Sequence, residues 1–187
     1  SLNHSVFILL TLAPMNTWIY NSSVDLGKAA GKSAAQLIRD TIASSGSANI
    51  ILATGTSQFE TLKELVAAKN IDWSKVVMFH LDEYISVPIT HPASFRKYLK
   101  ERFLSQVPHL KNAWLINGET DGEEECKRLG DLILKYPIDV ALIGIGENGH
   151  IAFNDPPADF ETEKPFIIVE LNDACKKQQM GEGWFQS

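Results

Sequence analysis

The sequence has few of the residues that mark several large functional classes. Only two cysteines occur, Cys126 and Cys175, and their separation fits neither a CxxC pair nor a zinc-binding spacing. We interpret them as free thiols in a reducing compartment, the cytoplasm. The net charge is -6, and no block of basic residues occurs. This balance argues against nucleic acid as a partner, because binding to phosphate backbones requires clustered Lys and Arg.

Long apolar runs are also scarce. The most apolar stretch, residues 6–13, is far shorter than the roughly 20 residues that a helix needs to cross a bilayer, so we expect no membrane partner. This stretch is similar to the apolar part of a signal peptide but has no Lys or Arg before it. Because Met15 follows Pro14 at the end of this segment and is typical of a natural start, we expect residues 1–14 to be a non-native or irregular extension, with an extra strand as the alternative.

Strand and helix patterns alternate along the rest of the chain. Short apolar runs typical of buried strands occupy residues 17–20, 49–53, 76–79, 113–116, 139–143 and 166–169. Helical spacing of apolar residues occurs over residues 24–45, 59–68, 94–104 and 122–136. The alternation predicts an α/β fold of the three-layer, Rossmann-like kind, with a mainly parallel sheet and helices on both faces. No linker interrupts it, so we expect residues 15–187 to form a single domain.

The densest motif follows the predicted strand at 139–143. The segment Gly144-Ile-Gly-Glu-Asn-Gly-His-Ile-Ala-Phe-Asn-Asp places three glycines before His150 and Asp155. Glycine lets a backbone turn sharply and approach a ligand, and open α/β sheets bind ligands beyond their strand ends. Since an imidazole can move protons near neutral pH, we interpret the segment as a catalytic loop rather than a turn with a surface histidine.

Two further strand ends carry polar loops. Thr54-Gly-Thr-Ser lies between a strand and a helix, where it can cradle an anion or simply cap the helix, and its pattern favours neither. Asp82 and Glu83 follow the strand at 76–79, and adjacent residues on an extended chain point to opposite sides. One carboxylate can therefore enter a cleft, although a pair of solvated acids is the alternative. Strand ends of a parallel sheet share one edge, so we expect the three loops to converge. His80 and His91 belong to no metal-ligand set, and we expect no metal.

Together these motifs resemble the glucosamine-6-phosphate deaminase (isomerase) family of the 6-phosphogluconolactonase-like superfamily. The resemblance rests on Leu81-Asp-Glu-Tyr, on the Thr-Gly-Thr loop and on Gly-His-Ile-Ala-Phe-Asn, and it extends from about residue 15 to the last residue. It implies conversion of glucosamine 6-phosphate to fructose 6-phosphate and ammonia, with a small sugar phosphate as partner and no cofactor. The sequence leaves open whether copies of the chain form a homo-oligomer.

The resemblance also implies roles for individual residues. Asp82 matches the acid that carries a proton between C1 and C2 of the open-chain sugar, and His150 matches the histidine that helps to open the ring. Residues 54–57 match part of the phosphate site, and Lys176 falls near the position of a phosphate-binding arginine. The candidate catalytic residues are Asp82, His150, Asn148 and Asp155. The candidate substrate- or phosphate-binding residues are Thr54, Gly55, Thr56, Ser57, Glu83, Gly149 and Lys176.

Two residues depart from the family pattern. Asn148 stands where the family has an aspartate, and Asp155 stands where it has a glutamate. An amide can orient an imidazole but carries no charge to stabilise its protonated form. The family also continues well beyond residue 187, so we expect a domain truncated at its C-terminus. A 6-phosphogluconolactonase-type hydrolase and a sugar-phosphate sensor without turnover remain as alternatives. Ala152, Phe153 and Asn154 argue against the lactonase, whereas Asp82 and His150 argue against the sensor.

Overall fold

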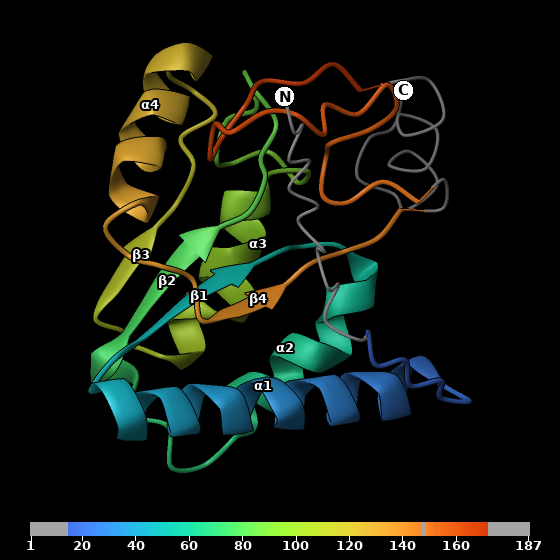
Figure 1. The fold of residues 1–187 in the computed structure, drawn as a ribbon, viewed down its shortest axis with the longest axis vertical. Helices are drawn as coiled ribbons and strands as arrows, with labels where there is room; N and C mark the ends of the chain where they lie inside the picture. The colour runs from blue at the N-terminus through green and yellow to red at the C-terminus, as the bar shows by residue number, and fades with distance from the viewer. Residues whose placement is uncertain (1–14, 147–148, 172–187) are drawn as a thin grey trace, which may run out of the picture.

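A computed structural model of the protein describes residues 15–146 and 149–171. Within these ranges four strands form one parallel sheet in the order β3-β2-β1-β4 (Figure 1). The strands are β1 (Ala48–Leu52), β2 (Val76–His80), β3 (Asn112–Trp114) and β4 (Val140–Leu142). The helices are α1 (Ser23–Ser45), α2 (Phe59–Ala67), α3 (Phe95–Arg102) and α4 (Gly122–Ile133). The α/β alternation that the sequence predicts is therefore confirmed.

Two local residues explain where α1 begins and ends. Ser22 is the N-cap, and its side chain accepts a hydrogen bond of 3.1 Å from the N–H of Asp25. Such a cap satisfies one of the N–H groups that a helix leaves unbonded at its start. At the other end Gly46 has a φ of 81° and donates its N–H to the carbonyl of Ile42. Ser22 and Gly46 thus bound the helix that the sequence predicts over residues 24–45.

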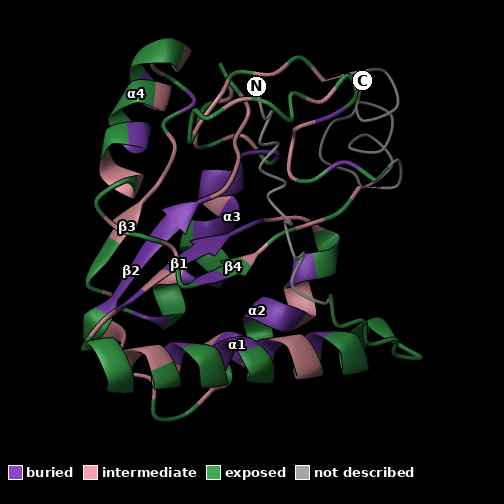
Figure 2. Cartoon of the chain, in the orientation of Figure 1, coloured by how far each residue is buried: buried purple, intermediate pink, exposed green. Residues whose placement is uncertain are grey.

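Helices cover both faces of the sheet. Ile50, Leu52 and Met78 point toward one face, where they pack in a single cluster with residues of α1, α2 and α3. Val77 and Phe79 point to the opposite face, which α4 covers. Figure 2 shows that burial is concentrated on β1 and β2 at the centre. Each fully buried side chain of this size contributes about 1.5–3 kcal/mol to folding, so the central strands are the best-anchored part of the sheet.

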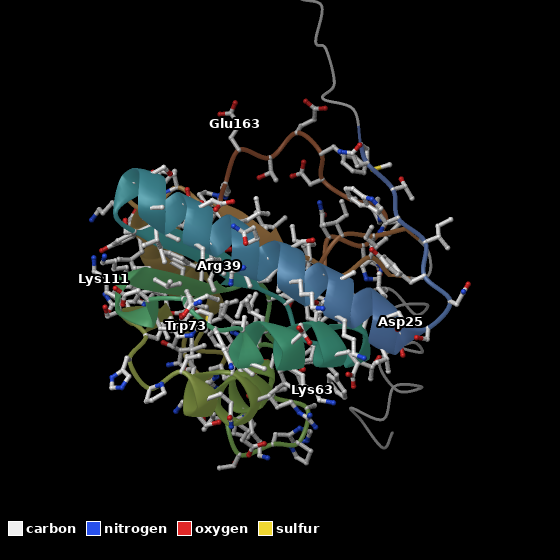
Figure 3. All side chains as sticks on the ribbon, turned by 90° about the horizontal axis from the view of Figure 1, so that it is seen from below. Asp25, Arg39, Lys63, Trp73, Lys111 and Glu163 are labelled. Atoms are coloured by element: carbon white, nitrogen blue, oxygen red, sulfur yellow. The ribbon has the colours of Figure 1, made fainter. Side chains whose placement is uncertain are left out.

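Helices α1 and α2 lie side by side beneath the sheet (Figure 3). Gly27 and Gly31 of α1 lie so close to α2 that a Cβ at either position would overlap Glu60, Thr61 or Glu64. Further along, the guanidinium of Arg39 donates a 3.1 Å hydrogen bond to the carbonyl of Lys69. No helix within the described ranges is long and apolar enough to cross a membrane.

Two predicted strands are wrong. Residues 17–20 are exposed and form no strand, and residues 166–169 form none either. The second segment instead runs along α4, with Ile168 beside Gly122 and Pro165 beside Gly130. Both segments are apolar, but a strand also requires a neighbour that takes its backbone hydrogen bonds. The predicted strand at 113–116 is shorter and lies slightly earlier, at Asn112–Trp114. Residues 1–14, which the sequence predicts to be an extension, lie outside the described ranges.

The register of the sheet positions the functional loops. Leu52 at the end of β1 pairs with His80 at the end of β2 and with Leu142 at the end of β4. The three strands therefore finish level with one another, and their loops leave from the same edge of the sheet (Figure 1). This edge is where parallel α/β sheets bind ligands.

Candidate active site

The loops after β1, β2 and β4 meet around one cleft of about 140 Å³. The loop after β1 contributes residues 53–57, the segment after β2 contributes Asp82, and the loop after β4 contributes glycines and His150. Phe95 from the start of α3 and Phe153 complete the lining. The convergence of the three strand ends is thus the arrangement expected from a parallel sheet.

The loop after β1 presents hydroxyl groups to the cleft. Thr56 and Ser57 are exposed and begin a short 3-10 turn that leads into α2. Gly55 has a φ of 115°, a backbone conformation that residues with a side chain rarely adopt. Oγ1 of Thr54 is buried and has no hydrogen-bond partner among the residues that the structure describes. A buried hydroxyl without a partner is uncommon in native proteins, and it is free to bind a ligand atom.

Asp82 has an unusual environment for a carboxyl group. Its Oδ1 is shielded from solvent and finds no hydrogen-bond partner in the described part of the chain. Burial raises the pKa of Asp82 from its ordinary value of 3.8, and the charge of the adjacent Glu83 raises it further, to about 7. A carboxyl group with this pKa exchanges its proton near neutral pH, as a general base must.

The loop after β4 folds back to place His150 beside Asp155. Nδ1 of His150 lies 3.4 Å from Oδ1 of Asp155, and both side chains are almost fully buried. Gly146 permits this arrangement, because a Cβ at that position would overlap the imidazole ring. Gly149, with a φ of 85°, donates its N–H to the carbonyl of Gly146 at 2.9 Å and so closes the turn. Gly149 shapes the loop and does not line the cleft.

Glu83 is not among the residues that line this cleft, and its role in substrate binding stays a prediction. Its carboxylate accepts hydrogen bonds from the N–H groups of Phe95 and Arg96, the first residues of α3. Alternation along the extended chain explains the result, since Asp82 takes the side of the cleft. Asn148 and Lys176, two further candidates, lie outside the described residues.

Sequence reasoning missed the aromatic residues of the site. Tyr84, Phe95 and Phe153 form a cluster with ring centroids 5.0, 5.1 and 5.7 Å apart. The cluster joins the segment after β2 to the start of α3 and to the glycine loop. No local pattern predicts it, because the three rings come from separate segments. Among the described residues no three His, Cys, Asp or Glu side chains gather in a group that could hold a metal ion.

The chain is similar to enzymes that act on sugar phosphates. Residues 21–180 match the sequence model of the family described as glucosamine-6-phosphate isomerases/6-phosphogluconolactonase. A glucosamine-6-phosphate deaminase of Streptococcus pneumoniae (strain 70585) is 35% identical over 143 residues, which are 76% of this chain and 59% of that protein. The chain thus spans about three fifths of the length of the curated relatives it matches.

Solved structures give the same result for the fold. A monomeric glucosamine-6-phosphate deaminase superposes with a TM-score of 0.74 at 28% identity, over 89% of this chain and 68% of the other. A 6-phosphogluconolactonase from Shewanella baltica superposes with a TM-score of 0.63 at 20% identity, over 71% and 57%. The second likeness concerns the fold alone. With its matching sequence and its parallel sheet, the chain belongs to the glucosamine-6-phosphate isomerase/6-phosphogluconolactonase family.

Proposed function

We propose that the protein converts glucosamine 6-phosphate and water to fructose 6-phosphate and ammonia, in the cytoplasm. The observation that carries the proposal is the carboxyl group of Asp82. Its Oδ1 is shielded from solvent and has no hydrogen-bond partner among the described residues, and its pKa is about 7 at the edge of a cleft that also contains His150 and a hydroxyl-rich loop. The S. pneumoniae relative, named as a glucosamine-6-phosphate deaminase, supports the same reaction.

In the proposed proton transfer, the Asp82 carboxyl group acts first as a base and then as an acid. In the open-chain sugar, the C1 aldehyde acidifies the hydrogen on C2. Asp82 removes this hydrogen as a proton while O1 gains one, which leaves a double bond between C1 and C2. The same carboxyl group then returns the proton to C1, and the C2 amine becomes an imine by releasing one proton, which offsets the proton gained by O1. Water adds to the imine and ammonia leaves, so one water is consumed for each ammonia released. A pKa near 7 suits a group that must first accept and then donate a proton.

His150 is the proposed proton carrier for ring opening. Its imidazole lines the same cleft as Asp82, and the 3.4 Å approach of Asp155 to Nδ1 orients it. Ring opening moves a proton from the hydroxyl group on C1 to the ring oxygen, which an imidazole can do near neutral pH. The division of labour therefore assigns the oxygen-bound protons to His150 and the carbon-bound proton to Asp82.

The loop at residues 54–57 is the proposed anchor for the phosphate group. It offers the hydroxyls of Thr54, Thr56 and Ser57 at the entrance to α2. Helix N-termini favour anions because their N–H groups and the helix dipole point toward the ligand. Holding the phosphate there positions the other end of the sugar across the cleft toward Asp82.

The test is to incubate the full-length protein with glucosamine 6-phosphate and to measure ammonia and fructose 6-phosphate. Stoichiometric release of both, lost in Asp82→Asn, supports the proposal. The same preparation is assayed with 6-phosphogluconolactone, and hydrolysis without ammonia release would replace the proposed function by that of a lactonase. Binding of glucosamine 6-phosphate in calorimetry without either product would identify a sensor.

A further inference from the structure

The carboxylate of Glu83 is fully buried and accepts four hydrogen bonds from the protein. Its Oε1 accepts from the N–H of Tyr84 at 3.0 Å and from the N–H of Phe95 at 3.1 Å. Its Oε2 accepts from the hydroxyl of Ser94 at 3.0 Å and from the N–H of Arg96 at 2.8 Å. Because both oxygens accept hydrogen bonds from the protein, the Glu83 side chain is held in one orientation.

Three of the four donors belong to the start of α3. An α-helix leaves its first four N–H groups without a partner inside the helix. Here Glu83 takes the N–H groups of Phe95 and Arg96, and the hydroxyl of Ser94 takes that of Lys97 at 3.3 Å. The fourth, the N–H of Ser94 itself, donates to the carbonyl of His91 at 3.0 Å. A negative charge at a helix N-terminus is also favoured by the helix dipole, so Glu83 ties the chain after β2 firmly to α3.

Arg96 extends this anchor to the connection after β3. Its Nε lies 3.6 Å from Oε2 of Glu83. One terminal nitrogen donates to the side-chain oxygen of Asn117 at 2.7 Å, and the other donates to Glu119 at 2.7 Å. The arginine is itself buried. The backbone at Glu83 is therefore held from two directions, by α3 and by the segment that leads into α4.

Asp82 precedes Glu83 directly and points to the opposite side of the extended chain. Its own Oδ1 has no hydrogen-bond partner among the described residues that would fix its direction. We propose that Glu83 is a positioning residue for Asp82, because its anchor to α3 fixes the backbone that aims the Asp82 carboxyl group into the cleft. The functional consequence of this inference rests on the proposed deamination. The charge of Glu83 has a second effect, since after burial it is the other cause that raises the pKa of Asp82.

The test uses Glu83→Gln, which removes the charge but keeps the shape, and Glu83→Asp, which keeps the charge but shortens the reach. In the full-length protein we expect Glu83→Gln to lower kcat roughly tenfold or more with little change in KM, as misplaced catalytic groups do. The acidic limb of its pH profile, which is the pH range where kcat/KM falls on acidification, should move down by roughly half a pH unit or more, because the negative charge beside Asp82 is removed. Glu83→Asp should lower kcat and leave the limb in place.

Glu119→Gln is the matched control. It makes the same chemical change on the other carboxylate that Arg96 contacts. The glutamine oxygen still accepts from Arg96, and all four hydrogen bonds to Glu83 remain, so kcat and the acidic limb should both stay at their wild-type values. The remaining titratable groups around the two carboxyl groups are unchanged in every variant. They are His150 across the cleft, Arg96 on α3, and Glu125 and Cys126 on α4.

A readout that does not need turnover separates this inference from the proposed function. The Asp82 carboxyl carbon is titrated by NMR in the wild type and in Glu83→Gln, with Asp82→Asn to assign the signal. If the wild type releases no ammonia but the Asp82 titration moves to lower pH in Glu83→Gln, the deamination is refuted and the coupling of the two residues stands. Wild-type kcat and an unmoved titration in a folded Glu83→Gln protein would overturn the inference. If that variant does not fold, wild-type kcat in Glu83→Asp would overturn it.

Discussion

Replacing Asp82 by Asn should abolish turnover and, at the same time, stabilise the protein at alkaline pH. The amide has the shape of the carboxyl group but cannot accept the proton from C2, so we expect kcat to fall by about two or more decades. The effect on stability follows from the raised pKa. An acid whose pKa is raised by folding holds its proton more tightly in the folded state. Its contribution to stability is therefore complete below the unfolded value, 3.8, and is lost as the pH rises to the folded value, about 7.

The magnitude follows from the difference between the two pKa values. Between them, the free energy of unfolding falls by about 1.36 kcal/mol for each pH unit, because the unfolded state has released a proton that the folded state still holds. From pH 5 to pH 8 the wild type should lose about 2.5 kcal/mol from this one group. Asp82→Asn loses none of it. An unpaired amide also lowers the free energy of unfolding by about 1–3 kcal/mol, but that cost does not change with pH. The gap between the two proteins, meaning the difference in their free energies of unfolding, therefore widens with pH only through the ionisation of Asp82.

The assay is urea unfolding of both proteins, followed by tryptophan fluorescence, at several pH values from 5 to 8. All other ionisable groups are common to the two proteins and cancel in the difference. A gap that widens with pH in favour of Asp82→Asn supports the raised pKa. A gap that stays constant would mean that Asp82 titrates at its ordinary pH, and the buried-base argument would then be refuted. Full turnover by the variant would separately exclude Asp82 as the base.

Three further predictions follow from the same site. In the wild type, kcat/KM should fall as the pH drops below about 7, because only the ionised form of Asp82 accepts the proton; a profile that stays level down to pH 5 would contradict this assignment. His150→Gln should slow the closed-ring substrate more than an open-chain analogue, and equal slowing would refute the division of labour between His150 and Asp82. Gly146→Ala should lower kcat roughly tenfold or more, because its Cβ would displace the imidazole. Gly144→Ala, whose Cβ would meet no atom within 4 Å, should cost less, and an equal loss in both variants would show that displacement of His150 is not the cause.

Local signals in the sequence are sufficient to predict several elements of this fold. The cap at Ser22 and the glycine stop at Gly46 set the bounds of α1. The apolar runs at β1 and β2 identified the buried centre of the sheet, because a strand buried on both faces needs apolar residues throughout. The glycines before His150 predicted a tight loop, and the structure gives that loop positive φ at Gly149 and a close approach at Gly146.

Packing between distant segments sets which apolar runs form strands and what environment each carboxyl group has. Residues 17–20 and 166–169 have strand-like sequences, yet pairing depends on a neighbouring strand that no local pattern reveals. Asp82 and Glu83 are adjacent carboxylic acids with nearly the same chemistry. One faces a cleft where burial raises its pKa to about 7, and the other accepts four hydrogen bonds, mostly from the start of α3. Their difference arises from desolvation and from donors that lie far along the chain, and both come into being only when the sheet and helices assemble.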